Sequence, residues 1–305
     1  MGRVLKAVAV AALGAALALG LAAAGSGRAK SPRVGAYRGL ATWVDLYDPK
    51  AWVSPEASVA AMRERGVRTL FLETGNYRQH VLIRRRALVE RFVDAAHDYG
   101  MRIVAWYLPS FARPRADFRR SLAPIRLRTQ TGQRFDSFAL DIEASVVRSP
   151  QRRTARLLKL SRRIRRAVGH SYPLGAVIPS PRGMQLLPHY WPKFPYAGLA
   201  QIYDVFLPMT YFSYRPRDLG GPFGYTRRGV RIIRRATGKP RVRVHPIGGL
   251  ADALRDAQVA AFLRAVHTCG AMGASLYDFT TTRPSGWRRL AGVPRRAHAP
   301  AGSCS

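Results

Sequence analysis

Eight short runs of β-branched and aromatic residues recur along the chain, and successive runs begin roughly 30 to 38 residues apart. A strand followed by a helix takes about 30 residues, so this spacing indicates repeated strand–helix units. Eight such units predict a (β/α)8 TIM barrel, an α/β fold, and an open doubly wound sheet is the alternative. The predicted strands cover residues 38–45, 68–73, 101–108, 135–143, 173–178, 203–211, 241–246 and 273–278.

Amphipathic segments lie between several of these runs. Ser54 followed by Pro55 predicts a capped helix start, and Gly66 its end. Further helices are expected over residues 87–99, 152–168 and 252–268, each ending close to a glycine. No linker divides the chain, so we expect one barrel over residues 31–296 and an unstructured tail over residues 297–305.

The first 30 residues resemble a targeting segment rather than part of the fold. Arg3 and Lys6 precede an apolar, Ala-rich stretch over residues 7–24, and small residues follow at 22–25. This order is typical of a signal peptide and its cleavage site. About 18 apolar residues also approach a membrane-spanning length, which leaves an uncleaved anchor as the alternative. In either case we expect a secreted or cell-envelope protein.

The net charge is strongly positive. The sequence carries 51 Lys and Arg residues against 17 Asp and Glu residues, giving +34 at pH 7. Such a balance favours anionic partners, here anionic wall polymers. All but six of the basic residues are arginine and they are dispersed along the chain, which codon usage in a GC-rich genome also produces. The sequence contains no nucleic-acid recognition motif, so we expect no nucleic-acid partner. We also expect the protein to be a monomer.

Two cysteines, Cys269 and Cys304, are present. Export would permit a disulfide between them that holds the C-terminal tail, but two cysteines do not define a disulfide scaffold. Histidines and cysteines do not cluster at metal-ligand spacing, and no nucleophile elbow or phosphate loop occurs. We therefore expect neither a metal nor a cofactor.

Scarce carboxylates fall at the predicted ends of strands, where TIM barrels carry their chemistry. They are Asp45, Glu73, Asp141, Glu143 and Asp278. A salt bridge at the top of the barrel is the structural alternative for each of them, given the many arginines. Acids on predicted helices, by contrast, are explained by exposure to solvent.

The predicted fourth strand places two carboxylates on one face. Alternation directs Phe138, Leu140 and Ile142 toward the helices, and Ser137, Ala139, Asp141 and Glu143 into the barrel. Asp141 and Glu143 then stand about 6.6 Å apart along the strand, so the pKa of one of them should rise. A protonated carboxyl group beside an ionised one is suited to general-acid attack on a glycosidic oxygen.

This strand resembles the DxxDxDxE signature of family 18 glycoside hydrolases, the chitinase-like barrels. The matching residues are Asp136, Asp141 and Glu143, and the sixth strand adds Met209 and Tyr211, similar to the family's Met-x-Tyr-Asp motif. The resemblance implies that Glu143 is the acid/base, that Asp141 orients a substrate N-acetyl group, and that Tyr211 donates a hydrogen bond to the sugar.

The pattern departs from that family at two positions. Ala139 stands in place of the middle Asp, and Phe212 in place of the Asp after the tyrosine. The Asp-x-Glu pair also resembles, more loosely, that of family 25 muramidases, in which Asp45 would correspond to an acidic position near the site. As a whole the chain is similar to an exported actinobacterial barrel related to these hydrolases.

Aromatic side chains near strand ends would provide faces for sugar rings, although packing inside the barrel is the alternative for each. They are Trp43, Trp106, Tyr107, Tyr211 and Tyr277, with Asn76, Tyr77 and His245 as further candidate contacts. We therefore expect a glycosidase acting on an envelope or extracellular polysaccharide. A non-catalytic carbohydrate-binding barrel with a degenerate site, and a protein held on the wall by charge alone, are the alternatives.

Overall fold

The computed structural model describes residues 34–214 and 220–294 together with Cys304. Eight parallel strands form one sheet in the order β6-β5-β4-β3-β2-β1-β8-β7. Two isolated parallel bridges, Phe206 to Val244 and Met209 to Ile247, join β6 to the segment of β7 and complete the ring. The strands are β1 (Gly39–Val44), β2 (Thr69–Asn76), β3 (Arg102–Leu108), β4 (Ser137–Asp141), β5 (Leu174–Ile178), β6 (Val205–Pro208), β7 (Ile247–Leu250) and β8 (Gly273–Tyr277).

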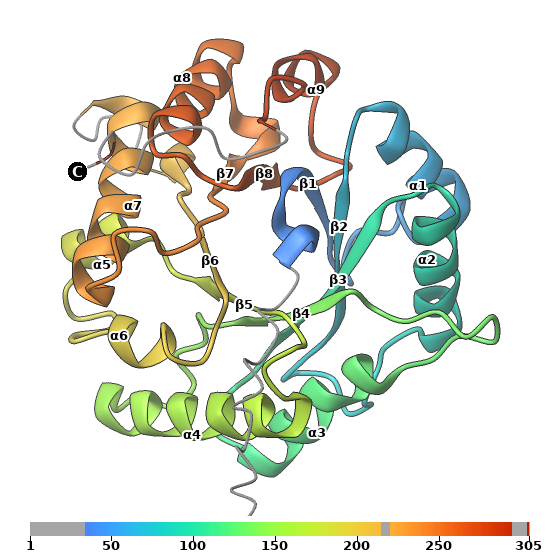
Figure 1. Ribbon diagram of the computed structural model, residues 1–305, viewed down its shortest axis with the longest axis horizontal. Coiled ribbons are helices and arrows are strands. Elements are labelled where there is room, and N and C mark those ends of the chain that lie inside the picture. The colour runs from blue at the N-terminus through green and yellow to red at the C-terminus, as the bar shows by residue number, and fades with distance from the viewer. Residues whose placement is uncertain (1–33, 215–219, 295–303, 305) are drawn as a thin grey trace, which may run out of the picture.

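Helices surround this ring of strands, as Figure 1 shows. The fold is therefore the predicted (β/α)8 TIM barrel. The α-helices are α1 (Pro55–Glu64), α2 (Arg86–Asp98), α3 (Pro114–Arg126), α4 (Pro150–Val168), α5 (Pro181–Leu186), α6 (Tyr196–Leu199), α7 (Gly221–Thr237), α8 (Asp256–Thr268) and α9 (Pro284–Leu290). The 3-10 helices are η1 (Val34–Tyr37), η2 (Phe212–Tyr214) and η3 (Ala251–Ala253).

Alternation along the strands divides the apolar side chains into an outer and an inner core. Phe138, Leu140 and Ile142 belong to the outer core between the strands and the helices. Ala139 belongs to the inner core, which Trp43, Phe71, Trp106 and Met209 also fill. The predicted directions of the side chains on the fourth strand are thus confirmed. The inward-facing row that includes Ala139 ends at the carboxylate of Asp141.

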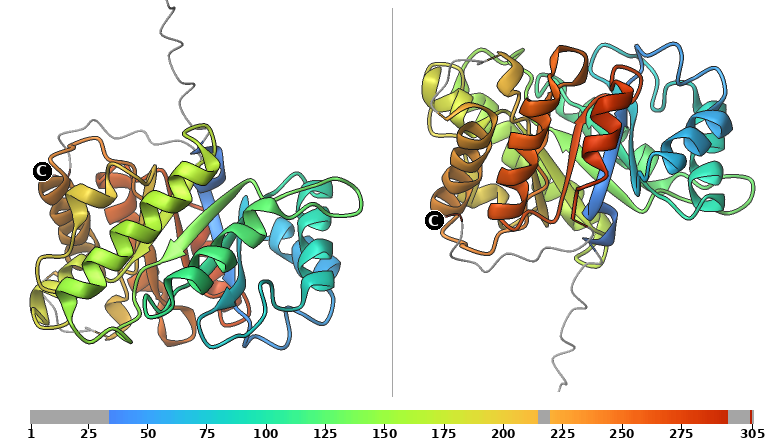
Figure 2. Two further views of the ribbon diagram at one scale, coloured as in Figure 1. Left: turned by 90° about the horizontal axis from the view of Figure 1, so that it is seen from below. Right: turned by 90° about the horizontal axis from the view of Figure 1, so that it is seen from above.

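The short helix η1 closes one end of the barrel (Figure 2). Tyr37 is fully buried, its hydroxyl lies 2.6 Å from Ser137 Oγ, and it donates to the carbonyl of Phe138. Glycine is required around it: a Cβ at Gly175 would stand 2.7 Å from the Tyr37 hydroxyl, and one at Gly273 would stand 2.6 Å from the Tyr37 carbonyl. The inner core is therefore sealed at the end where the strands begin.

Several predicted boundaries need correction. The strand expected over residues 241–246 begins instead at Ile247, after Pro246. Proline has no N–H for a strand ladder, so only Val244 of the predicted run forms a bridge. The helix expected from residue 252 begins at Asp256, because residues 251–253 form η3. The Ser54 cap of α1 is confirmed, since its side chain accepts a hydrogen bond from the Ala57 N–H.

A disulfide joins Cys269, which follows α8, to Cys304. Cys304 is fully buried, so this residue of the expected tail is held against the body of the protein. The expected signal segment lies outside the described residues. Within the described residues, no helix is both long enough and apolar enough to cross a membrane.

Candidate active site

Carboxylates gather where β1, β2, β4 and β8 end, which is the end of the barrel opposite η1. Their mutual electrostatic effects show how close they lie: Glu143 and Glu73 both contribute to raising the pKa of Asp141, and Asp45 and Glu143 contribute to raising that of Glu73. The structure therefore brings together the carboxylates that the strand ends predicted.

Asp141 is the last residue of β4 and is 6% exposed. Burial first, and then the charges of Glu143 and Glu73, hold the pKa of Asp141 well above its ordinary value. Its Oδ1 is buried and has no hydrogen-bond partner among the described residues. A buried oxygen without a partner is available to a bound ligand.

Glu143 lies two residues beyond the end of β4, and its side chain is half-buried. Burial raises the pKa of Glu143, which favours the protonated form. The backbone carbonyl of Glu143 accepts a short hydrogen bond from the hydroxyl of Tyr190. This contact holds the backbone of Glu143 and leaves the carboxyl group outside the interaction.

Sequence reasoning missed Tyr190 and the residue behind it, Arg153 of α4. Arg153 is 2% exposed, and its guanidinium lies 4.0 Å from the ring centre of Trp191 and donates to the carbonyl of Tyr190. Tyr190 lies in the long segment after β5, far in sequence from Glu143 and outside every strand end, so no periodic pattern marked it.

Glu73 ends the inward-facing row of β2 and is 2% exposed. Its Oε2 accepts from the Leu46 N–H at 3.0 Å and its Oε1 from Asn76 Nδ2 at 2.9 Å. Burial raises its pKa to about 7, although these two hydrogen bonds favour the ionised form. Glu73 therefore exchanges its proton near neutral pH.

Asp45 and Asp278 occupy the β8–β1 side of the site. The Tyr277 hydroxyl donates to Asp45 Oδ2, and Asp278 Oδ1 accepts from the Thr281 N–H at 3.0 Å. Burial first raises the pKa of Asp278, and the nearby charges of Asp48 and Asp45 add to the effect. Asp48 was missed by sequence analysis because it lies in the loop after β1. Its Oδ2 accepts a hydrogen bond from the hydroxyl of Thr280, in the loop after β8.

Aromatic residues form the floor beneath the carboxylates. Trp43 stacks on Phe71 with ring centres 4.2 Å apart and donates to Ser275 Oγ, so it packs inside the barrel. Trp106 is 5% exposed, and its Nε1 has no hydrogen-bond partner among the described residues. Met209 belongs to the same inner core, against which Tyr211 and Tyr277 pack from above. Burial raises the pKa of Tyr211, with Glu143 and Asp141 adding to it.

Two predicted contacts lie elsewhere. Tyr107 faces outward because its neighbour Trp106 faces inward, and its hydroxyl donates to Asp117 of α3 at 2.8 Å. His245 is fully buried at the η1 end of the barrel, with Nδ1 2.9 Å from the carbonyl of Tyr37. Burial lowers the pKa of His245 to about 4, so it stays neutral at ordinary pH. Neither residue belongs to the carboxylate cluster.

The chemistry available here is proton transfer. In the described part of the chain, no group of three or more His, Cys, Asp or Glu side chains is arranged to hold a metal ion. Several carboxyl groups with raised pKa values stand over an aromatic floor. Among the described residues, Trp106 Nε1 of the floor lacks an acceptor and Asp141 Oδ1 of the cluster lacks a donor. Such groups can give or take a proton beside a bound ring.

Comparison with known proteins gives similarity of structure and not of sequence. No protein-family model and no curated protein matches the sequence. The spore cortex-lytic enzyme SleL of Bacillus cereus is similar with a TM-score of 0.63 at 10% identity, covering 84% of this chain and 74% of that one. A chitinase from Bacteroides thetaiotaomicron has a TM-score of 0.61 at 10% identity, covering 85% and 96% respectively. A chitinase from Chromobacterium violaceum has a TM-score of 0.59 at 9% identity, covering 84% and 98%.

Proposed function

We propose that this protein is a glycoside hydrolase in which Glu143 is the general acid. The observation that carries the proposal is the Asp141–Glu143 pair at the end of β4, where both pKa values are raised and the two groups interact. A carboxylic acid with a raised pKa keeps its proton to higher pH and can deliver it to a leaving oxygen. The resemblance of this strand to the family 18 signature points to the same roles.

In the proposed reaction the Glu143 proton passes to the glycosidic oxygen as the bond to the anomeric carbon breaks. Water then supplies a hydroxyl group to that carbon, and its other proton returns to the Glu143 carboxylate. Asp141 modulates the pKa of Glu143 and offers Oδ1 to a polar group of the sugar. The Tyr211 hydroxyl donates a hydrogen bond to the same ring.

A polysaccharide of the cell envelope is the proposed substrate. The predicted export of the chain would place it outside the cytoplasmic membrane, and the proteins of similar structure include a spore cortex-lytic enzyme and a chitinase. The aromatic floor of Trp106, Tyr211 and Tyr277 supports binding of pyranose rings through their C–H faces.

The direct test is release of reducing ends from purified envelope glycans and chitin oligomers by the wild type and by Glu143→Gln. The substitution keeps the size of the side chain and the backbone contact to Tyr190, but removes the transferable proton. Release by the wild type that falls by about 10²-fold or more in the variant, with binding retained, is the expected result. Asp98→Gln, an exposed acid on α2, is the control for a general effect of lost charge.

A non-catalytic carbohydrate-binding barrel is the second candidate. Two departures from the family 18 pattern favour it: Ala139 supplies no carboxyl group, and Phe212 is buried in the outer core, 5.8 Å from Phe262 between ring centres. Absence of release by both proteins, together with glycan binding that Trp106→Ala abolishes, would establish this reading and rule out the hydrolase.

A further inference from the structure

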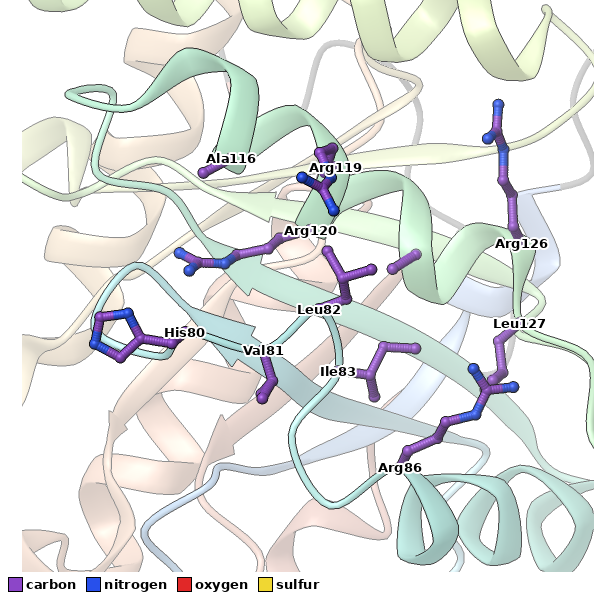
Figure 3. A pocket seen from close by; sticks show the side chains of 11 residues that line it. His80, Val81, Leu82, Ile83, Arg86, Ala116, Arg119, Arg120, Arg126 and Leu127 are labelled. Atoms are coloured by element: carbon purple, nitrogen blue, oxygen red, sulfur yellow. The ribbon is translucent and has the colours of Figure 1, made fainter.

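A groove of about 640 Å³ runs along the outer wall of the barrel, between α3 and the loop that leads from β2 into α2 (Figure 3). Four arginines line it: Arg86 at the start of α2, and Arg119, Arg120 and Arg126 on α3. The lining includes no carboxylate. The groove therefore combines a concave shape with positive charge alone.

The four arginines differ in the contacts that their guanidinium groups already make within the protein. Arg86 pairs with Glu90 at 2.8 Å, and Arg120 donates to the carbonyl of Tyr77. Arg119 and Arg126 are exposed, and neither forms an ion pair with a described residue. A guanidinium group binds carboxylate and phosphate through paired N–H donors. The side chains of Arg119 and Arg126 can therefore bind an anionic ligand in the groove.

Apolar side chains complete the groove. Val81 and Leu82 of the β2–α2 loop are 46% and 43% exposed, and both line it. Figure 3 shows them between the arginines of α3 and Arg86. Apolar surface flanked by cations matches a chain of sugar rings, each with a C–H face and an acidic substituent.

The groove is connected to the carboxylate cluster through one short segment. Arg120 contacts the carbonyl of Tyr77, Tyr77 follows Asn76, and Asn76 donates to Glu73. The segment from Glu73 to Tyr77 therefore links one wall of the groove to the edge of the proposed active site.

We propose that this groove is a secondary binding site for an anionic polysaccharide whose repeat carries carboxylate or phosphate groups. It rests on the proposed function in that such a polymer is then also the substrate class. A sugar chain fits better than a membrane surface because the apolar residues lie within a concavity that a flat bilayer does not enter.

The test measures binding in the Glu143→Gln background, where no turnover disturbs the equilibrium. Fluorescently labelled polygalacturonate oligomers supply carboxylates on sugar rings, phosphorylated dextran supplies phosphates on sugar rings, and unmodified dextran is the uncharged polymer. Arg119→Gln with Arg126→Gln is compared with Arg162→Gln with Arg166→Gln, an exposed pair on α4 that lines no part of the groove. The two double variants carry the same net charge, and thermal melts confirm that both fold.

The groove variant is expected to lose about tenfold or more in affinity for one or both anionic polymers, while the α4 variant loses less than about twofold. The arm that shows the loss identifies carboxylate or phosphate as the recognised group. Equal losses in both variants would assign binding to the general surface charge and overturn the proposal. So would an unchanged groove variant, or binding of anionic phospholipid vesicles that depends on the same two arginines.

Turnover of the anionic polymers and of neutral chitin oligomers is measured separately, with Glu143 restored. If neither polymer nor oligomer is cleaved but the groove variant still loses affinity, the proposed hydrolase fails and the groove stands. If cleavage depends on Glu143 but affinity for anions does not depend on Arg119 and Arg126, the groove fails and the hydrolase stands.

Discussion

Trp106 on β3 and Ala139 on β4 are register partners, and both side chains lie in the inner core of the barrel. The methyl group of Ala139 therefore lies at the same level of the barrel as the indole of Trp106 on the neighbouring strand β3. Position 139 is where the family 18 pattern has its middle Asp. In this protein an aromatic residue therefore occupies space close to where a further carboxylate would stand.

Restoring that acid should not restore a family 18 site. Ala139→Asp would bury a carboxyl group in an apolar layer and is expected to lower the free energy of unfolding by about 3 kcal/mol. Denaturant unfolding measures the loss, with Ala139→Ser as the small polar control. A variant as stable as the wild type that also gains activity would contradict this and mark the site as degenerate.

Glu73 should make stability depend on pH. Its folded pKa of about 7 lies above the ordinary 4.5, so the folded state holds the proton more tightly than the unfolded state. Stability is then lost as pH rises from about 4.5 to about 7, by about 3 kcal/mol from this group. Melting temperatures at pH 5 and pH 8 should differ less in Glu73→Gln than in the wild type. The exposed Glu64→Gln on α1 should leave the difference unchanged.

Asp136 is expected to be structural although it matches the first position of the family 18 signature. It accepts from the Ile103 N–H at 2.9 Å and lies 3.1 Å from His97 Nε2, where β4 begins and away from the carboxylate cluster. Asp136→Asn should cost about 1–3 kcal/mol of stability, with activity per folded molecule retained. Glu56→Gln, which breaks an exposed pair with Arg91, should cost less stability than Asp136→Asn, because solvent screens the pair. Loss of turnover in a folded Asp136→Asn protein would overturn the assignment.

The Cys269–Cys304 disulfide should contribute to stability by restricting the unfolded chain. It joins residues 35 positions apart, for which loss of the crosslink is expected to cost about 2–4 kcal/mol. Unfolding with and without reductant measures this, and Cys304→Ser should match the reduced protein. No change in melting temperature on reduction would show that the bridge does not constrain the chain.

Tyr190 should act as a positioning residue for Glu143. Removing its hydroxyl in Tyr190→Phe frees the Glu143 carbonyl and is expected to lower kcat about fivefold with KM unchanged, equivalent to about 1 kcal/mol. A shift of the alkaline limb of the kcat–pH profile, where Glu143 loses its proton, would separate positioning from a general loss of packing. Tyr172→Phe is the matched control, because that hydroxyl is buried without a partner among the described residues.

Much of the barrel and of its acidic end could be predicted from sequence because strand alternation is a local property. The facing of Phe138 and Leu140 against Ala139 and Asp141 follows from a period of two. The same rule limits the aromatic set: Trp106 and Tyr107 are adjacent, so both could not face the site. Trp106 faces the interior of the barrel, and Tyr107 faces α3.

Other features depend on contacts between distant segments and had no local signal. His245 is part of the barrel interior because η1 brings the Tyr37 carbonyl to it, a pairing 208 residues apart. Tyr190 reaches Glu143 from an irregular segment, and Asp48 reaches Thr280 from another. Such loop residues are placed by the barrel as a whole, which periodicity does not describe.

The closure by η1 also fixes an orientation. Residue 34 enters the barrel at the end where Tyr37 meets Ser137, and Asp141 and Glu143 stand at the other end of the same strand and just beyond it. A tether attached on the N-terminal side of Val34 would therefore join the barrel at the end opposite its carboxylates, and the site would not have to face the surface that carries it.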